Sequence, residues 1–145
     1  MTLLELVIAS TILVILASVA LPIGRMTIKR QQESELRRSL REMRTAIDRY
    51  KDAADRGLIQ VELGTEGYPP DLDVLVRGVT LAGAPDRRVR FLRKIPIDPL
   101  TGRADWGMRS VQDEPNSATW GGKNVFDVYS RSQGTAIDGT RYADW

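Results

Sequence analysis

The sequence predicts an α+β fold in which one long N-terminal α-helix packs on a small antiparallel β-sheet. Three observations support this prediction. Residues 1–24 are almost entirely apolar, residues 25–56 combine dense charge with an apolar stripe, and residues 57–145 contain short strand-like segments between turns. We therefore expect a hydrophobic helix over 1–24, its amphipathic continuation over 25–56, and a small globular domain over 57–145.

The composition excludes several common catalytic chemistries. The 145 residues include no cysteine and no histidine. There is therefore no disulfide framework, no thiol nucleophile, no imidazole ligand and no Ser-His-Asp triad. The 21 Lys and Arg residues nearly balance the 19 Asp and Glu residues, giving a net charge of +2. This balance argues against a nucleic-acid-binding protein.

The first segment predicts a membrane helix. No charged side chain occurs from Leu6 to Gly24, and about 20 apolar residues span a bilayer core as a helix. A secretory signal peptide has a charged region before its apolar core and a cleavage site after it, whereas here the core begins almost at once. The simplest alternative interpretation is a plain signal anchor that holds a soluble domain.

Glu5 and Pro22 distinguish this segment from a plain anchor. An acid at membrane depth is costly and usually has a partner. Glu5 also fits a Thr-x-x-Glu capping box with Thr2, and the two roles are compatible. Pro22 removes a backbone donor, and Gly24 follows closely, so we expect the helix to kink or loosen there.

The charged segment continues the helix. Apolar residues recur at steps of four, three, four and three, at Leu36, Leu40, Met43, Ile47 and Tyr50. Neither glycine nor proline occurs from Met26 to Ala54, so one helix of about 80 Å is expected. Mixed charges such as Glu33 and Arg37 predict a solvated face with i,i+4 pairs, and acids within the basic region exclude a basic leucine zipper.

Basic residues follow the apolar run directly, at Arg25, Lys29 and Arg30. The positive-inside rule places such residues, and hence the C-terminal domain, in the cytoplasm. This expectation reverses if a basic leader preceded Met1 and was removed.

The globular part is expected to be mostly β. Gly57 is a plausible helix cap, and Asp71–Val76 a short helix stopped by Gly78. Strands are predicted within Arg103–Val111 and Val125–Ser130. The segment 87–97 is expected to be a rigid extended turn because of its prolines, and 113–123 a loop.

The N-terminal pattern Met1-Thr2-Leu3-Leu4-Glu5-Leu6-Val7, followed by the apolar run and Pro22, resembles the mature start of type IV pilin-like proteins. In that family a prepilin peptidase cleaves after a leader glycine, and the new N-terminus is commonly methylated. Phe is usual at the first position and Met is an accepted variant. The resemblance therefore implies an N-methylated Met1.

The remainder resembles the major pseudopilin, or G subunit, of type II secretion systems. The shared motifs occur in the family's order: Tyr68-Pro69-Pro70, Lys94-Ile95-Pro96-Ile97-Asp98-Pro99-Leu100-Thr101-Gly102, Phe126-Asp127-Val128-Tyr129-Ser130, and the ending Ala136–Trp145. The absence of cysteine favours this family over many type IV major pilins, whose C-terminal loop is closed by a disulfide.

This resemblance implies a pilin-like fold and a homopolymeric filament. Glu5 would pair with the α-amino group of a neighbour's Met1, and Pro22 and Gly24 would let the packed helices unwind locally. A non-closing contact of this kind generates fibres. The subunit would cross the bacterial inner membrane once, with a periplasmic domain, before joining a periplasmic or extracellular filament that promotes protein export across the outer membrane. Its partners would be minor pseudopilins, an inner-membrane assembly platform and an outer-membrane secretin.

Relatives bind calcium in the C-terminal loop, which makes Asp138 and Asp144 candidate ligands, with Ser130 as a helper. No other cofactor is expected. The alternative is that Asp138-Gly139 is a simple turn and that Tyr142 and Trp145 hold the loop on the sheet.

Two other functions are considered. A type IV pilus subunit for adhesion, motility or DNA uptake would share the N-terminal pattern. A membrane-anchored enzyme would require paired carboxylates, such as Asp71 with Asp73 or Asp98 with Asp105. Ordinary surface acids explain these pairs better, so we do not expect an enzyme.

Overall fold

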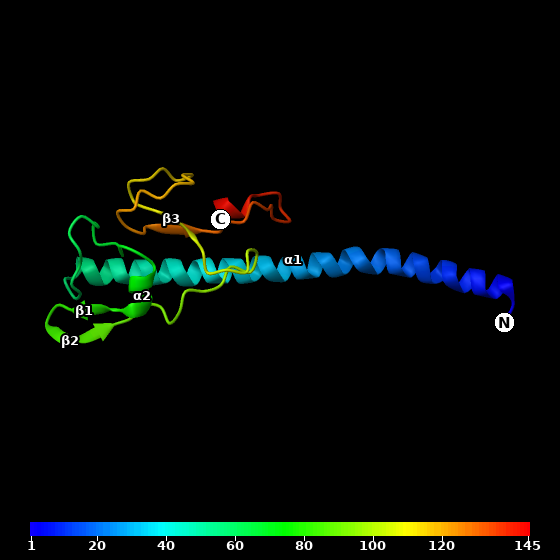
Figure 1. Ribbon diagram of the computed structural model, residues 1–145, viewed down its shortest axis with the longest axis horizontal. Coiled ribbons are helices and arrows are strands. Elements are labelled where there is room, and N and C mark those ends of the chain that lie inside the picture. Colours follow the sequence, from blue (N-terminus) through cyan, green and yellow to red (C-terminus); the bar gives the residue numbers. More distant parts are fainter.

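The computed structural model describes residues 1–145 and contains one dominant helix, α1, at Leu3–Asp55. The rest of the chain gathers around the second half of α1 and leaves its first half bare (Figure 1). The other elements are short: α2 (Asp73–Arg77), β1 (Val79–Leu81), β2 (Ala84–Val89), β3 (Gly107–Arg109), β4 (Asp127–Tyr129) and the 3-10 turn η1 (Tyr142–Asp144). The predicted α+β class is confirmed.

Both ends of α1 are capped, but only the threonine half of the predicted Thr2–Glu5 capping box forms, because the Glu5 carboxylate accepts no hydrogen bond from the backbone. At its start, the Thr2 hydroxyl accepts a hydrogen bond from the Glu5 backbone N–H at 3.2 Å, as expected of an N-cap threonine. At its end, Gly57 adopts a positive φ of 66° and donates to the Ala54 carbonyl, while Leu58 donates to the Ala53 carbonyl. These two bonds satisfy carbonyls that have no partner inside the helix.

The helix is not interrupted at Pro22 and Gly24, where a kink or loosening is expected, although α1 bends gently along its first half (Figure 1). α1 remains α-helical through both residues. Proline removes one donor and crowds one carbonyl, and the turns on either side keep their own hydrogen bonds. The local unwinding expected inside a packed filament therefore stays a prediction.

The apolar stripe of α1 forms the centre of the core, as predicted. Leu36, Met43 and Ile47 are fully buried, and Leu40 and Tyr50 nearly so. Two groups of elements pack on this stripe, one formed by α2 with β1 and β2, the other by β3, β4 and η1 (Figure 1). The main contributors from these groups and their loops are Ile59, Leu75, Leu92, Trp106, Val125, Val128 and Tyr142.

The single sheet expected from the sequence is instead two separate two-stranded antiparallel sheets, β1–β2 and β3–β4. The second sheet lies within the predicted strand segments, and it pairs Gly107 with Tyr129. A side chain at Gly107 would collide with the Tyr129 ring, so this close crossing requires glycine.

The hairpin β1–β2 was not predicted, and residues 87–89 belong to it rather than to an extended turn. β2 carries Asp86, Arg87 and Arg88 in succession, all exposed. This edge strand therefore lacks the alternation of apolar and polar residues on which strand prediction depends.

Candidate functional site

The bare first half of α1 is the most unusual surface of the molecule. All residues from Met1 to Ile28 are exposed, and an 18-residue window in this half has a mean hydropathy of 2.6 with none of it buried. Monomeric soluble proteins rarely expose contiguous apolar patches beyond roughly a few hundred Å². By length and composition, α1 can cross a membrane once.

Hydroxyl groups within this half already have partners on the same helix. Thr11 donates to the Val7 carbonyl at 2.7 Å, Ser18 to the Ile15 carbonyl at 2.7 Å, and Ser10 to the Leu6 carbonyl. These side chains can therefore enter an apolar environment without an unsatisfied donor.

The Glu5 carboxylate is the exception. It has no hydrogen bond and no cation within ion-pair distance, and the α-amino group of Met1 has no carboxylate partner either. The Glu5 side chain borders a shallow groove that also contains Leu4, Ile8 and Ala9. The Glu5 carboxylate and the Met1 α-amino group thus lie at the same end of an apolar helix, and neither has a partner of opposite charge in its own chain.

Glu33 does not pair with Arg37, contrary to prediction. Its carboxylate instead accepts hydrogen bonds from the Tyr142 hydroxyl at 2.9 Å and the Ile137 backbone N–H at 2.8 Å. Burial, followed by the hydrogen bond and the negative charge of Glu33, raises the pKa of Tyr142 to about 12. Arg37 stacks on the Trp145 ring, with its guanidinium carbon 4.2 Å from the ring centroid.

Arg44 joins α1 to both β4 and the C-terminal segment, a role that the sequence did not reveal. Its guanidinium donates to Asp127 at 2.7 Å, to the Val128 carbonyl at 3.1 Å and to the Trp145 carbonyl at 2.7 Å. Partners so far apart in the sequence leave no local pattern. The only available signal was an arginine at the edge of the apolar stripe.

The candidate acid pairs of the enzyme hypothesis have other partners. Asp98 is fully buried and accepts hydrogen bonds from the Ser130 hydroxyl at 2.6 Å and the Leu100 N–H at 2.8 Å. Asp105 pairs with Arg131 at 3.3 Å. Asp71 accepts a hydrogen bond from the Val74 N–H in the first turn of α2 at 2.7 Å, and Asp73 is exposed. Asp98 and Asp71 therefore stabilise the local backbone.

The two candidate calcium ligands are also engaged. Asp138 accepts hydrogen bonds from both the N–H and the hydroxyl of Thr140, and these bonds lower the pKa of Asp138. Asp144 pairs with Arg141 at 2.9 Å. No group of three or more acidic side chains converges here or elsewhere, whereas calcium takes six to eight oxygen ligands. The side chains as placed fit the predicted turn at Asp138-Gly139 better than a calcium site.

Tyr142 and Trp145 hold the C-terminal segment, as the turn alternative predicts, but they do so mainly on α1. Tyr142 reaches Glu33, Trp145 lies against Arg37, and their rings contact edge to face at 5.2 Å between centroids. The segment is therefore fixed to the helix just beyond its bare half.

No family model, curated protein or solved structure matches this chain. The fold and the site define its class: an α+β protein with one N-terminal helix long and apolar enough to span a membrane, packed in its second half against two small antiparallel sheets.

Proposed function

We propose that the protein is a structural subunit that is held in a bacterial inner membrane by residues 1–24 and polymerises into the helical pseudopilus of a type II secretion system. The observation that carries this proposal is the unpartnered Glu5 carboxylate on a fully exposed apolar helix, four residues from an unpartnered α-amino group. The resemblance of the sequence motifs to those of major pseudopilins supports the same proposal.

Electrostatics explains how such an end drives assembly. A carboxylate in an apolar environment is stabilised only when a cation with good geometry replaces its water. The Met1 amine of a second subunit supplies that cation, and the first subunit's own amine then remains free for the next. Each added copy repeats the contact at a fixed axial offset, which produces a helical fibre and no closed ring.

Within this proposal, a prepilin peptidase exposes Met1. The filament then acts together with minor pseudopilins, the inner-membrane assembly platform and the outer-membrane secretin. The growing filament pushes folded substrates through the outer-membrane channel. The globular domain forms the outer surface, and residues 1–24 form the core.

The test is electron microscopy of filaments from cells that produce Glu5→Ala. Filaments should be lost, because the neighbour's amine then has no anion, while near-ultraviolet circular dichroism shows an intact domain. Glu35→Ala is the matched control, because Glu35 is another exposed acid of α1 without an ion pair. Filaments at normal levels in Glu5→Ala would show that the pairing is wrong.

Two further measurements separate this function from its alternatives. Mass spectrometry should find N-methylated Met1, whereas an unmodified Met1 behind a retained leader indicates a plain anchor. Deleting the gene should stop exoprotein release. Loss of surface fibres with intact secretion would instead identify a type IV pilus subunit.

A further inference from the structure

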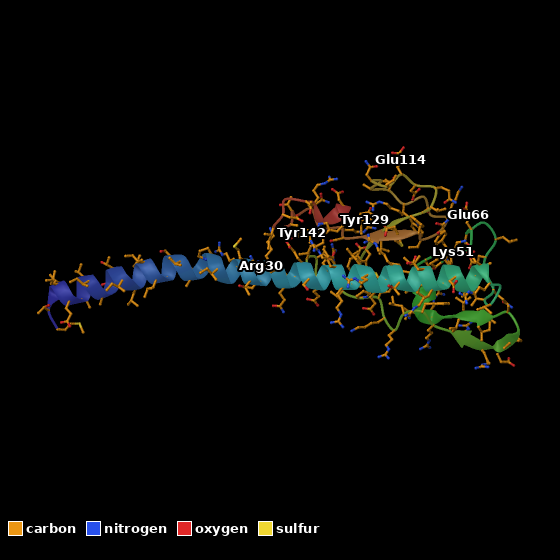
Figure 2. All side chains as sticks on the ribbon, turned by 180° about the vertical axis from the view of Figure 1, so that it is seen from behind. Arg30, Lys51, Glu66, Glu114, Tyr129 and Tyr142 are labelled. Carbon is orange, nitrogen blue, oxygen red and sulfur yellow. The ribbon has the colours of Figure 1, made fainter.

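The second half of α1 has a bare side that is rich in arginine. This side lies opposite the buried stripe and remains uncovered between the two groups of elements (Figure 2). Its exposed arginines are Arg30, Arg37, Arg38, Arg41 and Arg49, which we call the arginine face. Three adjoining hollows follow it, and Arg41 lines all three.

The arginine face has no close ion pair within the chain, although Glu33, Glu42 and Asp48 line its three hollows beside the arginines. None of its five guanidinium groups has a carboxylate within ion-pair distance, whereas Arg44, Arg56, Arg109 and Arg131 all do. Arg37 is held in place by Trp145. Guanidinium groups in this state bind carboxylates well, because the planar fork matches both carboxylate oxygens.

Four acidic residues are spread around the far end of the same domain without converging on one point. They are Glu62, Glu66, Asp71 and Asp73, which we call the acidic end. It adjoins the last turns of α1, since Lys51 donates to the Glu66 carbonyl at 2.9 Å (Figure 2). Burial, then the charges of Glu62 and Asp71, raises the pKa of Tyr50.

The acidic end is available to a partner from outside the chain. Glu62 and Asp73 are exposed and have no cation partner. The other two acids are partly engaged: Asp71 accepts from the Val74 N–H at 2.7 Å and lies 3.4 Å from Arg77, and Glu66 accepts from the Gln112 amide at 2.6 Å. α2, which carries Asp73, crosses the covered side of α1 in Figure 1, away from the arginine face. The two oppositely charged surfaces therefore lie on different sides of one subunit, and the arginine face extends from the height of the acidic end, at Arg49, toward the N-terminus, to Arg30.

We propose that the arginine face of one subunit binds the acidic end of a second copy within the filament. The inference rests on the proposed function and names a contact additional to the Met1–Glu5 pair. A surface that meets a different surface of the next copy forms an open filament when successive copies are also shifted along the axis, so that the ring cannot close. The net charge of only +2 favours a protein partner that carries its own compensating acids over a polyanion.

The geometry assigns this contact to another neighbour than the Met1–Glu5 pair. Lys51 marks the height of the acidic end on α1, and its distance from Arg38 along the helix axis is about 20 Å. The offset between Met1 and Glu5 is only about 6 Å on the same scale. A contact made through Arg38 and Arg41 therefore joins a subunit to a second, more distant copy than the one that its N-terminus contacts, whereas Arg49 lies only about 3 Å from Lys51 along the axis.

The experiment is a charge swap in the full-length chain, scored by filament yield in electron microscopy. Arg38→Glu with Arg41→Glu should lower the yield by about tenfold or more, because like charges then face each other. Adding Glu62→Arg and Asp73→Arg should restore it to within about twofold, since the attraction returns with reversed sign. Arg87→Glu with Arg88→Glu is the matched control, because these exposed β2 arginines also lack partners, and its yield should stay normal.

A cross-linking measurement covers variants that assemble poorly. The chain has no cysteine, so Arg38→Cys with Asp73→Cys should give a ladder of covalent oligomers, whereas Arg38→Cys with Arg88→Cys should not. Normal filaments in Arg38→Glu/Arg41→Glu, or no rescue by the swap and no ladder, would overturn the contact while leaving the filament proposal standing. Arginine-dependent binding to DNA or anionic vesicles, with unchanged filaments, would also overturn it. Loss of Glu5 dependence would count against the filament proposal itself.

Discussion

The two halves of α1 share one continuous backbone and differ in everything that surrounds it. Residues 36–50 bury one stripe completely against elements of their own chain, whereas residues 3–24 bury nothing. In the second half, charged residues cover the side that faces water. In the first half, apolar residues occupy every side.

This difference separates two sources of stability within a single helix. The second half belongs to a domain with a complete core. The apolar stripe of α1 is packed against other elements, the carbonyls at the C-cap of α1 have hydrogen-bond donors, and the buried Asp98 of the domain is also hydrogen-bonded. The first half has its backbone hydrogen bonds but no partner for its surface. Its apolar surface is of the kind that lipid or another apolar helix covers.

The largest predicted effect is that of removing residues 1–24. No core residue lies in this segment, so the remaining chain should leave the membrane entirely and keep its fold. Membrane sedimentation measures the first result and near-ultraviolet circular dichroism the second. An unfolded truncated domain would show that the two halves are not independent.

A paired truncation of leucines sharpens the comparison. Leu36 is fully buried and Leu16 is 61% exposed. Leu36→Ala should lower the free energy of unfolding by about 2–5 kcal/mol through lost burial and a cavity, whereas Leu16→Ala should change it by less than about 0.5 kcal/mol. Urea unfolding in detergent compares them, and equal losses would contradict this assignment of the core.

A smaller effect is expected at high pH, at the boundary between the halves. The pKa of Tyr142 is raised to about 12 in the folded chain, against about 10 in an unfolded chain. The folded state therefore holds this proton more tightly, so its contribution is full below pH 10 and is lost as the pH rises to about 12. Tyr142→Phe should remove this part of the pH dependence, measured by urea unfolding with phenolate absorbance as a check. If Tyr142→Phe leaves the dependence of unfolding free energy on pH unchanged, the contact with Glu33 does not hold the Tyr142 proton.

The smallest expected effect is that of calcium. The carboxylates of Asp138 and Asp144 are occupied by Thr140 and Arg141, so millimolar calcium should leave the melting temperature of the full-length chain in detergent unchanged. Asp138→Ala should lower the melting temperature slightly with or without calcium. A rise with calcium that Asp138→Ala abolishes would instead reveal a calcium site at Asp138.

Local patterns predicted the parts of the fold that depend on neighbours in the sequence. The extent of α1 follows from the spacing of Leu36 through Tyr50, and its ends follow from Thr2 and Gly57. Strand β4 follows from alternation in 125–130. Glu5 could be singled out because it is the one acid in an apolar run.

The features that escaped prediction depend on distant partners. Glu33 has an arginine four residues away and still binds Tyr142, because the burial of that tyrosine favours a direct acceptor over a solvated ion pair. Arg44 likewise binds a partner far away in the sequence, Asp127. The hairpin β1–β2 lies at the edge of the domain. Charged residues point to both faces of strand β2, so its sequence lacks the alternation of apolar and polar residues that predicts a strand.

The contact between Glu33 and the last turns of the chain also has a consequence for biosynthesis. Glu33 leaves the ribosome early, and its two hydrogen-bond donors, Ile137 and Tyr142, emerge about a hundred residues later. The domain cannot close during translation, and closure of so long a loop is slow. A prematurely terminated product lacks these donors and keeps an open flank on α1, where proteases can recognise it.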